Sequence, residues 1–347
     1  MQFQGKNHYG NWCRWINRIG VVSSVGGFGV SHLILFDNAE APRIIPDWSY
    51  RSDFQSCFSP FIGDVRIKDC LGDVFSKFNP DVVFHAAAYK LVPLMEDNFC
   101  GAVLVNACGS RNVANMCLKY GVEVTVMIFT DKVVNPTNIM RCTKRLTEIY
   151  VQSLSLAVEQ GKIRGKTTFV TTRFGNILRV IPRFREQISK GGPITVTHPE
   201  ITRFFMTISE ACRWVMEGVI IAKDNEIFVF DMGVSMKIVN LAKKMIELAG
   251  LRLDRDIKIE YIGIRSGEKL YEVVLSNTEN SMPTPHERIR IARVREYNHS
   301  EADGLMADLE ILSRKVRIDD MVKLMKSSVL EFKSKNSQFK KFDKQVS

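Results

Sequence analysis

The chain has 347 residues, of which 45% are hydrophobic and 25% charged, and its formal net charge is +10. This is ordinary globular composition, and it excludes disordered, collagen-like and coiled-coil chains. No run of about 18 apolar residues occurs, and the N-terminal residues lack the apolar region of a signal peptide. We therefore expect a soluble, cytoplasmic protein without a membrane span.

The positive charge suggests an anionic partner, and part of it comes from five lysines between positions 333 and 344. No nucleic-acid-binding motif accompanies it, so a phosphorylated small molecule explains the charge and no nucleic-acid partner is expected. The eight cysteines form no CxxC pair, and no histidine cluster has zinc-site spacing. We expect reduced thiols and no metal site.

From about residue 80 onward, short apolar runs alternate with helical stretches, which is typical of a parallel sheet covered by helices. The predicted class is α/β, with a Rossmann-like parallel sheet and a smaller C-terminal lobe. The predicted strands cover residues 33–36, 82–84, 124–129, 168–172, 227–230 and 257–262. The predicted helices cover residues 110–120, 143–160, 183–190 and 238–249. The last ten or so residues are expected to form a frayed tail.

The most informative residues for catalysis follow the predicted strand 124–129. Thr130, Asp131 and Lys132 lie where open α/β sheets place their ligands. A carboxylate beside an ammonium group, with a hydroxyl adjacent, provides a candidate general acid and base. The alternative is an ion pair in a loop.

A second candidate, Lys144, lies one helical turn after Met140 on the same face of the predicted long helix. Methionine neither donates nor accepts a catalytic proton, so Lys144 would act without a titratable neighbour at that position. The alternative is a core methionine followed by a surface lysine.

Small side chains at Ala86, Ala87 and Ala88 follow another strand and allow a ligand to approach the backbone closely; Lys90 lies just beyond them. The alternative is a tight turn between a strand and a helix.

Two further groups of residues lie at turns. The turn from Arg265 to Glu268 suits a diphosphate, while Asp37 and the pair Asp64 and Val65 are placed to meet a ribose and an adenine. The alternatives are a capped helix start and ordinary turn residues.

Taken in order, several segments resemble the nucleotide-sugar 4,6-dehydratases of polysaccharide biosynthesis, which are extended short-chain dehydrogenases/reductases. The segments are PDVVFHAAAYKLVPLMEDN (80–98), TDKVVNPTNIMRCTKR (130–145), TTRFGNIL (171–178), KGGPITVTHPEITRFFMTISEA (190–211), EIFVFDMG (226–233) and GEKLYE (267–272). Short-chain dehydrogenases hold Tyr and Lys four residues apart, and Met140 in place of this Tyr resembles the branch that acts on UDP-N-acetylglucosamine. Members of that branch are often fused to membrane spans, and this chain resembles their catalytic portion.

The resemblance implies a lyase that converts a UDP-N-acetylhexosamine into its 4-keto-6-deoxy sugar, with NAD rather than NADP as cofactor. Asp131 would be the general acid, Lys132 the base at carbon 5, Thr130 a hydrogen-bonding partner of the sugar and Lys144 the holder of the nicotinamide ribose. Asn106 matches the family's structural asparagine. The implied cofactor-binding residues are Asp37, Asp64, Val65, Ala86, Ala87, Ala88 and Lys144. The implied substrate-binding residues are Lys90, Arg173, Asn176, Arg203, Arg265 and Glu268.

With this family in view, the chain divides into three parts. Residues 1–172 would form the NAD-binding Rossmann-like domain, with 7–27 and 43–59 aberrant. Residues 173–293 would form the UDP-sugar lobe, interleaved with the core, and 294–347 a helical region with a basic tail. A homo-oligomer is expected.

Besides the aberrant window at 43–59, the sequence departs from the family in four places. Nothing at 7–27 resembles the family's first strand and glycine loop, so we expect the first strand and first helix of the sheet to be lost. The family's Ser is Phe129 here and its Gly is Arg141, and the loop at Arg179 is shorter. Two alternatives to the dehydratase follow: an inactive relic or UDP-sugar-binding protein, which would not retain the cofactor on purification, and an epimerase or reductase. The latter usually keep the Tyr at position 140 and lack the Thr-Asp-Lys run.

We predict that frameshifts in the gene explain residues 7–27 and 43–59. Read one base later, Trp12 followed by Cys13 and Trp15 followed by Ile16 each force a glycine codon, and other codon choices permit TIMVTGAAGSIGSEL. Read one base earlier, the second window permits LELQERFPKL. Genomic sequencing across codons 5–60 should show that single-base changes near codons 6, 27, 42 and 59 restore these strings. Stop codons in the shifted frames, or a missing glycine triplet, would refute the prediction.

Overall fold

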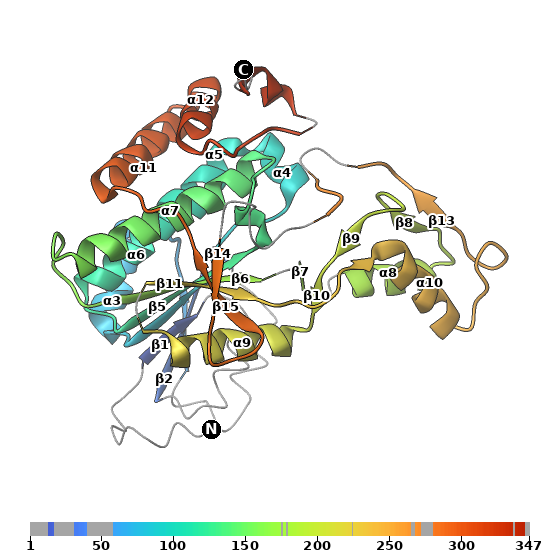
Figure 1. Cartoon of the computed structure of the whole chain (residues 1–347), viewed down its shortest axis with the longest axis horizontal. Helices are drawn as coiled ribbons and strands as arrows, with labels where there is room; N and C mark the ends of the chain where they lie inside the picture. The colour runs from blue at the N-terminus through green and yellow to red at the C-terminus, as the bar shows by residue number, and fades with distance from the viewer. Residues whose placement is uncertain are drawn as a thin grey trace.

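The computed structural model describes residues 31–39, 58–174, 180–223, 225–264, 268–271, 280–335 and 337–343, and the backbone of 13–16 and 176–177. Within these residues nine strands form one sheet in the order β14-β15-β11-β6-β5-β4-β1-β2-β3 (Figure 1). Their bounds are β1 Cys13–Ile16, β2 His32–Asp37, β3 Phe58–Ile62, β4 Val82–His85, β5 Val124–Thr130, β6 Thr168–Phe174, β11 Glu226–Phe230, β14 Asn280–Pro283 and β15 Ile289–Arg293. All neighbours are parallel except the pairs made by β15.

The predicted α/β class is confirmed, and the central strands β2, β4, β5, β6 and β11 lie where the apolar runs indicated. Their residues are buried on both faces, as expected for parallel strands covered by helices. The run predicted at 257–262 forms β13 (Ile259–Tyr261), which pairs outside this sheet with β8 (Ile194–Val196).

The expected loss of the first strand is wrong. The backbone of β1 lies between β2 and β4 and is parallel to both, with Trp15 opposite Ile34 on one side and Val83 on the other. Buried strands need partners for their backbone groups, and ladder hydrogen bonds are made by the main chain whatever the side chains. The expected loss of the first helix concerns residues outside the described ones.

Helices cover both faces of the sheet. On one face lie α3 (Lys68–Phe78), a π-helical segment η2 (Val103–Gly109), α6 (Ser110–Lys119) and α7 (Ile139–Glu159). Two short helices, α4 (Val92–Asp97) and α5 (Phe99–Ala102), precede η2, and α9 (Ile208–Ile221) lies on the other face (Figure 1). Helix α7 begins four residues before its predicted start because the side chain of Asn138 caps it, accepting a hydrogen bond from Arg141 N at 2.9 Å.

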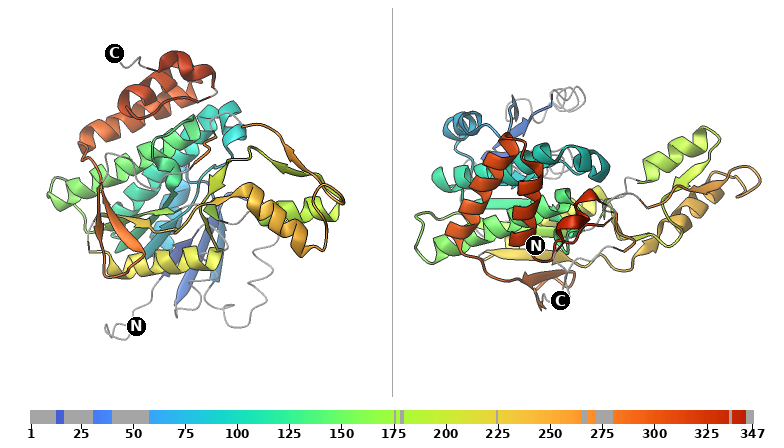
Figure 2. Two further views of the ribbon diagram at one scale, coloured as in Figure 1. Left: turned by 45° about the vertical axis from the view of Figure 1, so that its right-hand side comes forward. Right: turned by 90° about the horizontal axis from the view of Figure 1, so that it is seen from above.

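A smaller lobe projects from one side of the sheet (Figures 1 and 2). It contains α8 (Val180–Ser189), α10 (Ile238–Leu248) and the β8–β13 pair around the buried side chains of Phe184, Ile246 and Ile257. Two short pairs link it to the sheet region: β9 (Thr202–Arg203) with β12 (Met236–Lys237), and β7 (Asn176–Ile177) with β10 (Phe205–Met206). Because β11, β14 and β15 return to the main sheet, the chain passes between lobe and core more than once.

The C-terminal region forms a further layer. Helices α11 (His299–Arg314) and α12 (Ile318–Ser328) lie on the side of α7 that faces away from the sheet (Figures 1 and 2). Their apolar residues, among them Met306, Leu309 and Met325, join α7 in one core cluster. As a result nearly every residue of α7 is buried.

The expected frayed tail is also wrong as far as residue 343. Phe339 is only 2% exposed and lies in a 3-10 helix, η4 (Gln338–Phe342), while Phe332 is buried beside the Lys326 ammonium. Lys326 in turn bonds Asp343 and the Ser334 hydroxyl. Two buried aromatic rings and a buried ion pair hold this segment in place. Residues 344–347 lie outside the described ones.

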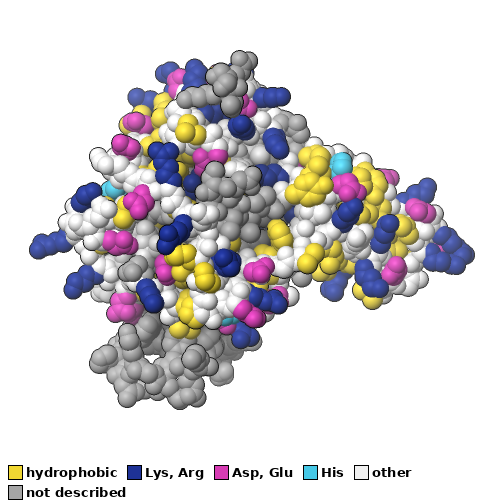
Figure 3. All heavy atoms as spheres, viewed as in Figure 1, with side chains coloured by type: hydrophobic (Ala, Val, Ile, Leu, Met, Phe, Trp, Pro, Cys, Tyr) yellow, Lys and Arg dark blue, Asp and Glu magenta, His cyan; other side chains and the backbone are white. Residues whose placement is uncertain are grey.

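The charged side chains on the surface do not separate by sign on the face seen in Figure 3. On this face, acidic and basic side chains are interspersed over both the core and the lobe. In the part of the chain that the structure describes, none of the helices is both long and apolar enough to cross a membrane.

Candidate functional site

Most of the predicted residues meet at one edge of the sheet. Strands β2, β4 and β5 end at Asp37, His85 and Thr130, and parallel strands place their carboxyl ends at the same edge. The loops that follow them carry the predicted cofactor and catalytic residues, as in other open α/β sheets.

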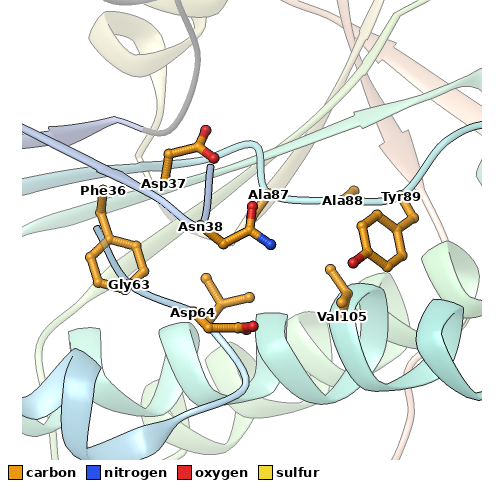
Figure 4. A pocket seen from close by; sticks show the side chains of 10 residues that line it. Phe36, Asp37, Asn38, Gly63, Asp64, Ala87, Ala88, Tyr89 and Val105 are labelled. Carbon is orange, nitrogen blue, oxygen red and sulfur yellow. The ribbon is translucent and has the colours of Figure 1, made fainter. Parts of the chain in front are cut away.

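A pocket opens at the β2–β4 end of this edge (Figure 4). Of the predicted cofactor-binding residues, Asp37, Asp64, Val65, Ala87 and Ala88 line it. Asn38 and Tyr89 line it too, and sequence reasoning missed them, although each directly follows a residue that it named. The other lining residues are Phe36, Gly63 and Val105. Phe36 and Tyr89 lie at opposite ends of the cavity (Figure 4).

Glycine at position 63 permits this pocket. A Cβ there would lie 2.5 Å from the Phe36 ring and 2.6 Å from the Cys70 Sγ. Any larger residue would therefore displace the Phe36 ring, which lines the pocket. The Gly63 amide donates to the Asp37 carbonyl at 2.9 Å, which ties the loop after β3 to the end of β2. The two carboxylate-bearing loops are thereby held side by side.

The two carboxylates of the pocket differ in their surroundings. Asp64 accepts hydrogen bonds from Arg66 Nε and Nη2, and these bonds hold the pKa of its carboxyl below the ordinary value. Asp37 accepts one from Ala39 N at 3.0 Å, an ordinary turn bond. The pocket is therefore a partly neutralised acidic site with apolar walls, which suits a nucleoside with hydroxyl groups.

The predicted catalytic turn lies farther along the same edge. Thr130 ends β5, and residues 131–133 form a 3-10 turn, in which Lys132 N donates to Thr130 Oγ1 at 3.4 Å. Lys132 is half-buried. Of Asp131 the structure describes the backbone.

Lys144 is brought to this turn by α7. Lys144 is only 6% exposed, and its Nζ lies 6.0 Å from the centre of the Phe129 ring near the end of β5. Met140, one turn earlier, is fully buried against Met95 and Ala102 of the two short helices. Met140 is thus a core residue, whereas Lys144 lies between α7 and the strand that carries the Thr-Asp-Lys turn.

A buried polar network holds the Ala86–Ala88 turn against α7. Asn106 Oδ1 accepts from Tyr89 N at 2.7 Å, and its Nδ2 donates to Tyr89 O and to Thr143 Oγ1. Ser110 Oγ donates to the Asn106 carbonyl, so His85 Nε2 donates to Ser110 Oγ at 2.7 Å. Burial, with a smaller effect of Lys144, lowers the pKa of His85 to about 3 and keeps the ring neutral. Ser110 and Thr143 carry no signal in the sequence that would have identified them.

Two of the predicted substrate residues contact each other in the lobe. Arg203 Nη2 lies 3.2 Å from Glu268 Oε1, and its Nη1 donates to the carbonyls of Thr202 and Leu270. Lys269 Nζ donates to the Val134 carbonyl at 2.9 Å, so this part of the lobe lies against the loop after the catalytic turn. Lys90 is half-buried beyond Tyr89. The side chains of Asn176 and Arg265 lie outside what the structure describes.

The substrate role expected for Arg173 is wrong for this conformation. Its side chain is 0% exposed, and its Nε and Nη2 donate to both oxygens of Glu148 at 2.7 and 2.6 Å. Glu148 also bonds Arg145 on α7. The guanidinium therefore joins β6 to α7 inside the core, because a buried carboxylate needs a charged partner.

Comparison with known proteins agrees with this architecture. The family model described as polysaccharide biosynthesis protein matches residues 20–294, which is well over half of the chain. The chain belongs to this family.

Three bacterial proteins illustrate what the chain is similar to. The capsular polysaccharide biosynthesis protein CapD of Staphylococcus aureus is 46% identical over 73% of this chain, and the probable polysaccharide biosynthesis protein EpsC of Bacillus subtilis is 47% identical over 75%. The chain spans 42% and 43% of the length of these two relatives. An inverting UDP-N-acetylglucosamine 4,6-dehydratase of Campylobacter jejuni is 30% identical over 81% of this chain and 80% of its own.

Solved structures share the fold. Pen from Bacillus thuringiensis has a TM-score of 0.71 and 28% identity, covering 83% of this chain and 89% of its own. The UDP-glucose 4-epimerase of Thermus thermophilus, solved with NAD, has a TM-score of 0.61 at 18% identity, over 76% and 89% of the two chains. These likenesses establish the Rossmann-like fold of this family member.

The buried ion pair of Arg173 and Glu148 gives a testable prediction. Arg173→Met should destabilise the chain by about 3 kcal/mol, the lower end for breaking a buried pair, because Glu148 retains Arg145. With an unfolding entropy of about 2.1 cal/mol/K per residue, this means a fall in melting temperature of roughly 4 °C. The measurement is thermal and urea unfolding of the purified chain.

The matched control is Arg213→Met, which removes an arginine 78% exposed from its pair with Glu217 on α9. This variant should stay within about 0.5 kcal/mol of the parent. Equal midpoints for the two variants would show that Arg173 does not stabilise the core, and would return it to the substrate-binding candidates.

Proposed function

We propose that the chain is a nucleotide-sugar 4,6-dehydratase that converts a UDP-N-acetylhexosamine into its 4-keto-6-deoxy product for polysaccharide biosynthesis. The observation that supports this most is one juxtaposition: the pocket that Asp37 and Asp64 line and the Thr-Asp-Lys turn share one sheet edge, with Lys144 between α7 and β5. The dehydratase of Campylobacter jejuni, similar over most of its length, supports the same reaction class.

The described residues fit the adenosine half of NAD. Asp37 at the end of β2 suits the hydroxyls of a ribose and would repel a 2′-phosphate, which favours NAD over NADP. Ala87 and Ala88 leave room for close approach, and Lys144 would hold the nicotinamide ribose. When bound, the nicotinamide would supply the hydride acceptor for carbon 4 of the sugar and return that hydride at carbon 6.

The chain's own residues would move the protons. Oxidation at carbon 4 would release the hydroxyl proton of that carbon to solvent and acidify the hydrogen at carbon 5, which Lys132 would remove while Asp131 protonates the departing hydroxyl of carbon 6. When the hydride returns to carbon 6, Lys132 would give its proton back to carbon 5, and Asp131 would regain a proton from solvent. The Thr130 hydroxyl would bond the sugar and orient it. Elimination of water thus needs an acid and a base on neighbouring positions, which the turn after β5 provides in sequence.

Met140 favours a dehydratase over an epimerase or reductase. Epimerases and reductases of this fold usually keep a Tyr at this position and lack the Thr-Asp-Lys run, whereas this chain has a fully buried methionine at 140 and carries that run at 130–132. The likeness to epimerase structures at 18% identity concerns the fold alone.

Binding of a UDP-sugar without turnover is the second candidate function. It is favoured by residues 7–27, whose sequence has no glycine-rich run of the kind that binds a pyrophosphate. Two or three missing charge-assisted hydrogen bonds, at roughly 1.5–3 kcal/mol each, would weaken NAD binding by a factor on the order of a thousand or more.

Turnover is the direct test of the first function. With millimolar NAD and UDP-N-acetylglucosamine, the purified chain should form a 4-keto-6-deoxy product, followed by mass spectrometry. Asp131→Asn and Lys132→Ala should each lower the rate by about 10²–10⁴-fold, the usual contribution of a positioned acid or base. Asp73→Asn on α3 and Lys190→Ala just after α8, both at exposed positions, are the matched controls. Parental rates in either catalytic variant would remove that residue from the mechanism.

Ligand-induced stabilisation separates the two functions. Binding without turnover predicts that the chain shows no rise in melting temperature with micromolar NAD and a rise of a few degrees with UDP. A ligand at a hundredfold excess over its Kd stabilises by about 2.7 kcal/mol, which is measurable in a chain of this size. A shift of several degrees with micromolar NAD would show that another backbone segment holds the pyrophosphate, and would contradict binding without turnover.

A further inference from the structure

The loop that joins the Thr-Asp-Lys residues to α7 is buried, and its first residue, Val133, is the last of the 3-10 turn. Residues 133–138 lead from the Thr-Asp-Lys turn to the first residue of α7, and all of them except Asn135 are buried. Position 135 has φ 43°, so the chain turns sharply there. A buried loop needs hydrogen-bond partners from elsewhere in the protein.

Those partners come from a distant part of the sequence, the segment of residues 329–335 and 337–343, which we name the strap. Lys333 N donates to the Pro136 carbonyl at 3.2 Å, and Lys335 N donates to the Thr137 carbonyl at 3.1 Å. The strap thus satisfies two consecutive backbone carbonyls of the loop. The contacting residues are nearly 200 positions apart in sequence.

Glu96, at the end of α4, bridges the strap and the start of α7. One carboxylate oxygen accepts from the amide of Ile139 at 3.0 Å, and the other accepts from the Ser337 hydroxyl at 3.3 Å. Ile139 is the first residue of α7, where backbone amides have no partner within the helix and a negative charge is favoured. Glu96 therefore fixes the helix start and holds the strap at the same point.

The strap is itself firmly anchored. The Phe339 ring packs edge-on against Phe99 of α5, with ring centres 4.9 Å apart. Glu331 accepts from Arg145 Nε at 2.9 Å, and Arg145 also bonds the Glu148 that holds Arg173. Contacts of this kind on both sides make the strap a rigid support for the loop.

We propose that Glu96 and the strap are a positioning element that holds residues 133–138 and thereby sets Lys132 against Lys144. Lys132 is the residue before this loop, and Lys144 lies in the second turn of the helix that begins after it. Neither Glu96 nor Ser337 touches the reacting atoms in this scheme. Their catalytic relevance rests on the proposed dehydratase function, whereas their hold on the loop does not.

The test is hydrogen exchange by mass spectrometry on the full chain, without cofactor. Glu96→Ala should speed exchange of amides in residues 133–141 by about tenfold or more, because it removes both bonds of a charged acceptor. Ser337→Ala, a milder change at a half-buried position, should speed the same amides by less. Glu96→Gln retains an acceptor for Ile139 N and should restore slow exchange. Ser327→Ala and Glu186→Ala, at exposed positions, are the matched controls.

Kinetics supply a second measurement in a chain that turns over. Glu96→Ala should lower kcat by about tenfold or more while KM for the UDP-sugar stays within about threefold, because the loop supports the proton-transfer groups. Glu96→Gln should recover most of kcat.

The outcomes separate this proposal from the proposed function. Absence of product with faster exchange confined to residues 133–141 refutes the dehydratase and supports the hold of the strap on the loop. Unchanged exchange there in both Glu96→Ala and Ser337→Ala overturns the positioning element, whatever the activity. Faster exchange throughout the chain in both variants also overturns it, because the two residues would then support general stability.

Discussion

Helix α7 is buried along nearly its whole length, so every polar group that it carries has to find a partner inside the protein. Glu148 in its middle is matched by Arg173 from β6 and Arg145 from its own face. At its start, Asn138 and Glu96 accept the first free amides. Each of these contacts also fixes a strand, a loop or a short helix relative to α7, which makes this helix the reference for the candidate site.

The site follows from that arrangement. Lys144 comes from the first half of α7 and reaches Phe129 at the end of β5, so the burial of the helix sets where the ammonium lies. The Asn106 network ties the alanine turn and Tyr89 to Thr143, one residue earlier on α7. The pocket on the β2 side and the catalytic turn on the β5 side are therefore connected through one helix.

The comparison of sequence and structure is instructive at particular residues. Apolar runs predicted β4, β5 and β6 because buried parallel strands have a composition that no surface segment shares. Asp37, Asp64, Ala87 and Ala88 line one pocket because each lies at or just beyond the end of a parallel strand, and the sheet itself brings the strand ends together. Arg173 is the last residue but one of β6, where a side chain can point to the ligand edge or into the core, and the sequence does not distinguish the two. Only its partner Glu148 decides which.

The sequence by itself determined the α/β class, the family and the order of the chemistry-bearing segments, since these depend on local runs of residues and on motifs. Three features were decided by the tertiary structure alone: the strand at Cys13–Ile16, the burial of the Arg173 side chain in the core, and the packing of the strap. These features depend on contacts between residues far apart in the chain. Lys335 donates a hydrogen bond to Thr137, and Ser337 donates one to Glu96. No periodicity or motif in the sequence indicates either pair. A pattern within a short window reports what a segment prefers locally, and the partner across the core decides where its polar groups are satisfied.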